Sequence, residues 1–179
     1  MCSYQITPTI ETDRLILRRP RPEDAEPIAT LLCDYDVVKN LSRAPWPYTL
    51  DDAYDYVAKV DTLDAAYDQP LSIVHRDHGL IGGAGFQTTD DSLFPEIGYW
   101  IARAHWGQGY ATETAFAALN WAKAQWGKRA IASSHFADNA ASARVLVKAG
   151  FLYTGDVLER PCLARGNATT PTRMMIWLA

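Results

Sequence analysis

One stretch of the chain, residues 96–126, constrains the fold more than any other. It predicts a strand over Glu96–Arg103, a tight turn with glycines at positions 107 and 109, and an amphipathic helix over Thr112–Trp126. Glycine has no side chain to keep a ligand off the backbone, and the first turn of a helix offers free N–H groups at the positive end of its dipole. The segment therefore predicts a cradle for an anion such as a phosphate group.

The residues after the glycines separate three kinds of phosphate-bearing ligand. A P-loop for ATP needs Lys and then Ser or Thr after its last glycine, but Tyr110 and Ala111 follow Gly109. A dinucleotide fingerprint needs a third glycine where this chain has Thr112, and an acidic residue about 20 positions later. There the sequence reads Lys-Arg-Ala-Ile, which disfavours a Rossmann-type oxidoreductase. A pyrophosphate such as that of coenzyme A remains, as does a helix start that binds nothing.

A second motif follows over residues 138–151, which read Asp-Asn-Ala-Ala-Ser-Ala-Arg-Val-Leu-Val-Lys-Ala-Gly-Phe. They predict a helix with an Asx cap at its start and Gly150 just after its end. Together the two motifs resemble the GNAT superfamily of acetyl-CoA-dependent N-acetyltransferases. In that family the cofactor turn is Gln/Arg-x-x-Gly-x-Gly/Ala, and a later helix carries Asn, a small polar residue and Gly-Phe.

The opening of the chain extends this resemblance. Glu11-Thr-Asp-Arg-Leu-Ile-Leu-Arg-Arg-Pro20 and Glu96-Ile-Gly-Tyr-Trp100 are similar to segments of the ribosomal-protein N-terminal (RimJ/RimL-type) acetyltransferases. The likeness runs from about Glu11 to the C-terminal strand. It implies one α/β domain over residues 1–179, with a mixed and mostly antiparallel central sheet of about seven strands, helices on both sides, and a splay between the fourth and fifth strands.

The periodicity of apolar residues and the positions of capping residues, glycines and prolines predict the helices and strands of this fold. Strands are expected at residues 14–19, 71–75, 79–87, 95–103, 129–136, 151–158 and 172–178. Helices are expected at residues 22–33, 53–63, 112–126 and 139–148. A chain of 179 residues buries about 70% of its unfolded surface, which is enough for a core without disulfides or metals.

The resemblance also implies how acetyl-CoA is held. Backbone groups of Ile101 and Arg103 would contact the pantetheine arm and the acetyl oxygen, and the glycine turn would hold the pyrophosphate. The residues expected to contact the coenzyme are Ile101, Arg103, Trp106, Gly107, Gln108, Gly109, Tyr110, Ala111, Thr112, Asn139 and Ser142. Trp106 departs from the family pattern, because many members carry Gln or Arg at that position.

The expected reaction is direct transfer of the acetyl group from the thioester to a primary amine. Many relatives protonate the leaving thiolate with a tyrosine seven residues after the helix asparagine, but here that position is Leu146. Ser142 is the candidate acid instead, because the ribosomal branch carries a serine there; water is an alternative source of the proton. Glu96 and His135 are candidate bases. Their alternatives are a surface carboxylate at a strand start and a packed histidine.

Two irregular segments, residues 42–48 and 159–167, are expected to cover the acetyl end and select the acceptor. The candidate acceptor contacts are Arg43, Trp46, Tyr48, Glu159 and Arg160. The resemblance favours a protein N-terminal α-amine over a small-molecule amine such as a polyamine, an amino sugar or an antibiotic. A non-catalytic sensor of acyl-CoA also stays open, because Leu146 replaces the tyrosine.

Composition narrows the partners further. A formal net charge of −4 argues against nucleic-acid binding, and no apolar run approaches the length of about 20 residues that a membrane helix needs. The three cysteines show no CxxC spacing and no charged, apolar leader opens the chain, so a cytoplasmic protein is expected. No metal is expected, and both a monomer and a homodimer remain open.

Overall fold

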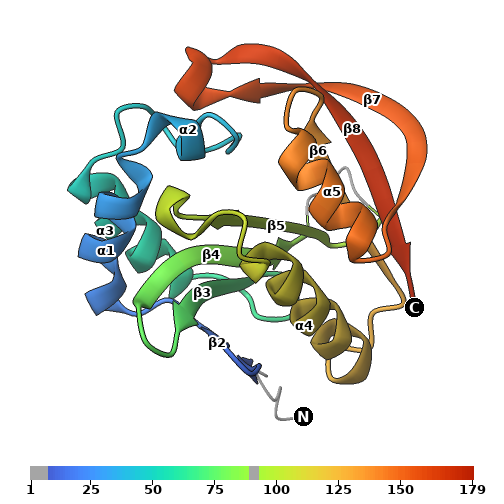
Figure 1. Ribbon diagram of the computed structural model, residues 1–179, viewed down its shortest axis with the longest axis horizontal. Helices are drawn as coiled ribbons and strands as arrows, with labels where there is room; N and C mark the ends of the chain where they lie inside the picture. The colour runs from blue at the N-terminus through green and yellow to red at the C-terminus, as the bar shows by residue number, and fades with distance from the viewer. Residues whose placement is uncertain (1–7, 89–92) are drawn as a thin grey trace.

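The computed structural model describes residues 8–88 and 93–179 and contains one sheet with helices on both faces (Figure 1). The described strands are β1 (Thr9–Glu11), β2 (Leu15–Arg18), β3 (Gln69–His75), β4 (Gly79–Gln87), β5 (Glu96–Ile101), β6 (Ala130–Phe136), β7 (Leu152–Cys162) and β8 (Ala168–Leu178). The described helices are α1 (Ala25–Leu32), α2 (Tyr35–Val38), α3 (Leu50–Val60), α4 (Tyr110–Ala124) and α5 (Ala140–Lys148), with short 3₁₀ turns η1 (Pro22–Asp24), η2 (Arg103–His105) and η3 (Leu163–Arg165).

The strand order is β1-β2-β3-β4-β5-β6-β8-β7, and every pairing except β5–β6 is antiparallel. This confirms the predicted mixed α/β sheet, but with eight strands instead of about seven. The additional strand is β1, whose three residues are too few to show an alternating pattern and are held by pairing with β2. Helix α2 was missed for the same reason, because it has only four residues.

The last two strands are longer than predicted. Each has 11 residues, so part of the segment expected to be an irregular loop, residues 159–162, belongs to β7. Pro161 lies within this extension of β7. Because β7 is the last strand in the sheet order, its proline removes no hydrogen bond that a further strand would need.

Strand β5 has two distinct faces, because successive side chains of a strand point to opposite sides. Ile97 and Tyr99 pack with the core formed by α4 and α5. Trp100 packs with the core formed by α1 and α3, on the other face of the sheet (Figure 1). The middle of the sheet therefore presents different side chains to the two helical layers.

The sheet opens between β5 and β6, which are the predicted fourth and fifth strands. A single residue pair, Glu96 with Ala132, joins them in register. The N–H of Ala132 donates to the Pro95 carbonyl oxygen at 2.9 Å, and the Ser133 hydroxyl donates to the Ile97 oxygen at 2.9 Å. No further pair follows between these described strands, which confirms the predicted splay.

A buried ion pair fixes the start of the fold. Arg18 of β2 donates two hydrogen bonds of 2.7 and 2.8 Å to Asp24 of η1, and the Ser72 hydroxyl of β3 donates a third at 2.8 Å. Burial alone would raise the pKa of Asp24, but these donors and the backbone N–H of Arg21 together lower it below its usual value. The charged form of Asp24 therefore stabilises the native state.

We predict that Asp24→Asn lowers the free energy of unfolding by about 3 kcal/mol at pH 7, because Arg18 is left nearly buried without its anion. The pKa of Asp24 is lower in the native state, so its contribution is fully present above about pH 4 and is lost as the pH falls through the native pKa. Urea unfolding at several pH values measures both effects.

Glu11→Gln is the matched control, because Glu11 pairs with Arg76 on the surface and such pairs contribute about 0–1 kcal/mol. If the free energies of unfolding of Asp24→Asn and the original protein differ by a constant amount down to pH 2, the role assigned to the charge of Asp24 is contradicted.

Candidate active site

The glycine turn requires its glycines for conformation. Gly107 and Gly109 have φ angles of 74° and 84°, in the left-handed region that other residues adopt at a cost. Gly109 is the N-cap of α4, so the helix begins at Tyr110, two residues before the predicted start. The turn thus leads directly into the helix, as a phosphate cradle requires.

The backbone N–H groups of this turn are free. In the part of the chain that the structure describes, no protein acceptor takes the N–H groups of residues 107–112. The first helical bond runs from the Glu113 N–H to the Gly109 oxygen at 3.0 Å. Consecutive free donors at the positive end of a helix are suited to an anion that bears several oxygens.

Arg14 holds the turn in place, a role that sequence analysis missed. Its guanidinium donates to the Gln108 carbonyl oxygen at 3.1 Å, pairs with Glu113 at 2.5 Å, and lies over the Tyr110 ring, 4.5 Å from its centroid. Burial would raise the pKa of Glu113, but hydrogen bonds from Thr12 and Arg14 lower it. The carboxylate in the first turn of α4 is therefore charged and neutralised by Arg14, which reduces its repulsion of a bound anion.

The opening between β5 and β6 exposes further backbone donors. The N–H of Ala102 donates to the Ile81 oxygen of β4 at 2.8 Å, and residues of an antiparallel pair alternate in the direction of their hydrogen bonds. The N–H groups of Tyr99 and Ile101 therefore point away from β4, towards the opening. Beside a thioester, such donors would polarise its carbonyl group.

Two predicted coenzyme residues beside this opening use their side chains within the protein. The indole N–H of Trp106 donates to the Ile101 oxygen at 2.7 Å, so Trp106 closes the end of β5. Arg103 lies beyond β5 in η2 and pairs with Asp36 at 2.9 Å and Asp34 at 3.6 Å. Any coenzyme contact of Arg103 would thus come from its backbone.

Ser142 lies at the start of α5, opposite Tyr99 of β5. The Asn139 side chain caps this helix by accepting from the Ser142 N–H at 3.0 Å. The hydroxyl groups of Ser142 and Tyr99 are 3.0 Å apart, and burial raises the pKa of Tyr99 to about 12. Sequence analysis missed Tyr99, although the alternation of β5 places it on this face. Leu146 is fully buried in the core beneath.

The two candidate bases are both engaged. Glu96 accepts three hydrogen bonds from Arg160, at 2.8, 3.1 and 3.0 Å, and one from the Ser134 hydroxyl at 2.7 Å. His135 is buried, and its ring nitrogens lie 2.8 Å from the Phe136 oxygen and 3.0 Å from the Tyr153 hydroxyl. Neither side chain can take a proton from an amine without giving up a partner.

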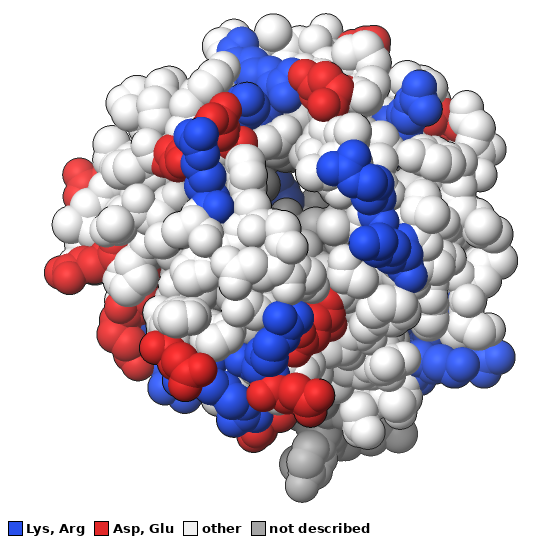
Figure 2. All heavy atoms as spheres, in the orientation of Figure 1, with Lys and Arg blue, Asp and Glu red and all other residues white. Residues whose placement is uncertain are grey.

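The two segments expected to cover the acceptor contact each other. The Leu163 N–H donates to the Ser42 oxygen at 3.1 Å, and the Arg165 side chain donates to the Lys39 oxygen at 2.8 Å. On the other side, Arg103 ties α2 to the segment before the glycine turn. Residues 35–48 and the β7–β8 hairpin therefore contact each other. In the orientation of Figure 1, the surface of the molecule has a hollow near its centre (Figure 2).

The predicted acceptor contacts have different surroundings. Trp46 is exposed and lies edge-on to Tyr35, whereas Tyr48 is buried in the core of α1 and α3. Arg43 donates to the Gln87 side chain, and Gln87 is the partner of Glu96 across β4 and β5. Arg43 and Arg160 thus lie near one face of β5.

Glu159 is an exposed residue of β7 with no ion pair among residues 8–88 and 93–179. Within those residues no group of three His, Cys, Asp or Glu side chains is arranged for a metal ion, and no helix has the length and apolar character of a membrane span.

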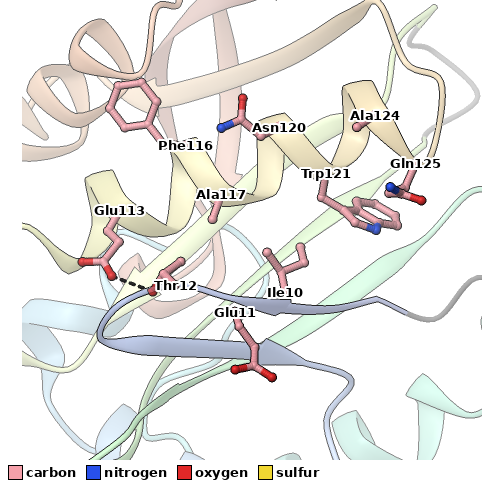
Figure 3. A pocket seen from close by; sticks show the side chains of 10 residues that line it. All are labelled: Ile10, Glu11, Thr12, Glu113, Phe116, Ala117, Asn120, Trp121, Ala124 and Gln125. Atoms are coloured by element: carbon pink, nitrogen blue, oxygen red, sulfur yellow. Dashed lines mark hydrogen bonds between the residues drawn. The ribbon is translucent and has the colours of Figure 1, made fainter.

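A separate groove lies between β1 and α4 (Figure 3). Its volume is about 610 Å³, and a 2.6 Å hydrogen bond from Thr12 to Glu113 lies at one end. It is lined by residues of β1, the turn after it and α4 together with Gln125, and none of these is a residue predicted to bind the coenzyme, bind the acceptor or transfer a proton. The site residues predicted from the sequence therefore do not line this groove.

Comparison with known proteins shows which family has a similar sequence. A family model described as an acetyltransferase (GNAT) domain matches residues 14–152. An uncharacterized N-acetyltransferase of Bacillus subtilis, YoaA, is 31% identical over 154 residues, which cover 83% of this chain and 85% of the relative.

Solved structures show a similar fold. RimJ of Mycobacterium smegmatis, in complex with CoA-disulfide, matches with a TM-score of 0.82 at 17% identity, over 98% of this chain and 89% of that one. Spermidine N-acetyltransferase of Vibrio cholerae, in complex with CoA and spermine, matches with a TM-score of 0.76 at 19% identity, over 93% of this chain and 96% of that one.

We predict that Gly109→Trp weakens binding of coenzyme A at least tenfold, or by about 1.4 kcal/mol, because the indole projects from the turn that bears the free N–H groups. Calorimetric titration measures the affinity. Gly127→Trp is the matched control, since Gly127 has a similar φ of 70° outside the turn. Equal affinity in a folded Gly109→Trp variant would place the coenzyme elsewhere.

Proposed function

The chain belongs to the acetyltransferase (GNAT) family, and from that premise we propose that it transfers an acetyl group from acetyl-CoA to a primary amine, favouring a protein N-terminal α-amine. The observation that carries this proposal is the run of free N–H groups over residues 107–112, next to an opening in the sheet. The run suits a pyrophosphate, and the opening suits an acyl group reached from both faces of the sheet.

The reaction needs no external proton. A neutral amine attacks the thioester carbonyl carbon, the new C–N bond forms, the C–S bond breaks, and the nitrogen loses one proton as the thiolate gains one. The donors along β5 and at the glycine turn hold and polarise the thioester. The chain has only to position the two reactants and stabilise charge on the departing sulfur.

We assign that stabilisation to Ser142. Its hydroxyl lies at the start of α5, and the neighbouring Tyr99 hydroxyl fixes its orientation. Tyr99 itself is a poor proton donor, because its pKa of about 12 lies well above the value of about 8.5 for a free thiol. A hydrogen bond from Ser142 to the sulfur, with the proton supplied by the amine, fits both hydroxyl groups.

The engaged bases favour an acceptor that loses its proton easily. Deprotonating an α-amine with a pKa near 8 costs about 1.4 kcal/mol at pH 7, whereas a lysine near 10.4 costs about 4.6 kcal/mol. Glu96 and His135 are each hydrogen-bonded to other side chains, so neither is free to deprotonate the acceptor amine. An N-terminal α-amine needs the least help among the candidate acceptors.

A small-molecule amine is the second candidate acceptor. The fold also matches that of a spermidine N-acetyltransferase, so the architecture serves more than one acceptor class. Two acids described above are already paired, Glu96 with Arg160 and Asp36 with Arg103, whereas Glu159 has no ion pair among the described residues. A polyamine would therefore meet little unpaired negative charge at Glu96 and Asp36, and Glu159 is the acid left to attract it.

Titration with acetyl-CoA, with NAD and ATP as controls, tests the first half of the proposal. Transfer assays with peptides that begin with alanine or serine, then with spermidine and an aminoglycoside, test the second. We expect acetyl-CoA to bind and the peptides to be acetylated. Binding without transfer to any amine would leave a sensor of acyl-CoA, and no binding would overturn the proposal.

We predict that Ser142→Ala lowers kcat about tenfold, equivalent to about 1.4 kcal/mol, because the departing sulfur loses its hydrogen bond. The fold should be kept, since the cap from Asn139 uses the backbone N–H of residue 142. Steady-state kinetics with a saturating peptide measures the effect.

Tyr99→Phe is the companion variant and should show a smaller loss of kcat, because only the orientation of Ser142 is affected. An unchanged kcat in Ser142→Ala would remove Ser142 from the mechanism.

A further inference from the structure

Gly98, in the middle of β5, has no structural reason to be glycine. Among the 11 glycines of the chain, seven have a positive φ, which other residues adopt at a cost. A side chain at Gly82, Gly83 or Gly85 would meet a neighbour at 2.2, 2.6 or 3.1 Å. Gly98 has neither constraint, because its φ is not positive and a Cβ there would meet nothing within 4 Å.

A glycine in a strand carries a cost that this position could avoid. It weakens the strand because it loses more conformational freedom on folding and offers no side chain to pack. A β-branched residue at an unobstructed strand position would favour the fold. Space is therefore left open above Gly98 at the expense of stability.

The open space lies on the acceptor side of the sheet. Gly98 stands between Glu96 and Trp100, on the face of β5 opposite Tyr99 and its neighbour Ser142. Its partner on β4 is Gly85, so two residues without side chains lie next to each other on neighbouring strands. The ion pair of Glu96 with Arg160 lies at one end of this strip, and the Trp100 indole at the other.

The strip also adjoins the point of acyl transfer. Gly98 immediately precedes Tyr99, whose N–H points into the opening between β5 and β6. With the coenzyme on the side of α4 and α5, an amine that reaches the same opening from the other face passes over Gly98. We propose that Gly98 is the specificity-determining residue of the acceptor channel, admitting a primary amine whose carbon next to the nitrogen is branched.

This inference rests on the proposed function and makes its substrate class specific. The nitrogen of a peptide N-terminus is attached to a carbon that carries both a side chain and a carbonyl group. The nitrogen of a polyamine or of a lysine side chain is attached to a CH₂ group. Only the branched carbon needs a second substituent to lie against the sheet, and the missing side chain of Gly98 provides that room.

The test compares Gly98→Ala and Gly98→Val with the original protein. We expect kcat/KM for an N-terminal alanine peptide to fall at least tenfold in Gly98→Val and less in Gly98→Ala. For an unbranched amine it should change less than threefold. Affinity for coenzyme A should be unchanged, and the urea midpoint equal or higher, because a Cβ at this position meets no neighbour and β-branched residues favour strands.

Gly82→Ala is the matched control for stability. Its Cβ would lie 2.2 Å from the Trp100 carbonyl oxygen, so its urea midpoint should fall, unlike that of Gly98→Ala. A lower midpoint in Gly98→Ala as well would give the glycine a structural role and overturn the inference.

The kinetic outcomes separate the two proposals. Full activity of Gly98→Val with the peptide, or turnover of the original protein with unbranched amines alone, would overturn the role of Gly98 and leave the acetyltransferase proposal standing. No turnover of the original protein with any amine would overturn both.

Discussion

The structure depends on a sheet that stops pairing in its middle. Strands β5 and β6 share one residue pair and then separate, which leaves backbone groups of β5 directed at an opening instead of at a neighbouring strand. Polar backbone groups within a fold need partners, so the opening has a chemical preference for a ligand that can hydrogen-bond to it. A few residues further on, the glycine turn adds more free N–H groups that need hydrogen-bond acceptors. Strand, turn and helix thus form one continuous surface of donors.

Side chains around this surface mainly support it. Arg14 neutralises Glu113 and holds the carbonyl group of the turn, Trp106 covers the last carbonyl of β5, and Asn139 caps the opposing helix. Their partners are protein groups, so they fix the direction of the backbone. Few side chains are left to perform proton transfer, which suits a reaction whose proton balance closes between amine and thiolate.

Sequence analysis found the elements whose patterns are local. The glycines at 107 and 109 and the cap of α5 need only a few consecutive residues to be recognised, whereas the opening between β5 and β6 was predicted from the family resemblance. It missed β1 and α2, which are short and held by tertiary contacts. It also missed the contacts of Tyr99 with Ser142 and of Arg160 with Glu96, since these join residues 43 and 64 positions apart. No local pattern encodes such distances.

The two faces of β5 have a consequence for how this strand can vary. Its side chains alternate between the core of α4 and α5 and the core of α1 and α3, so a shift of its pairing with β4 by one residue would exchange the two sets. Glu96 and Trp100 would then point towards α4 and α5, while Ile97 and Tyr99 would leave the core. An insertion or deletion within β5 would thus disrupt the hydrophobic core and the candidate active site together, whereas one in a loop would spare both. The pairing register of β5 thus determines both which of its side chains enter the core and which face the candidate site.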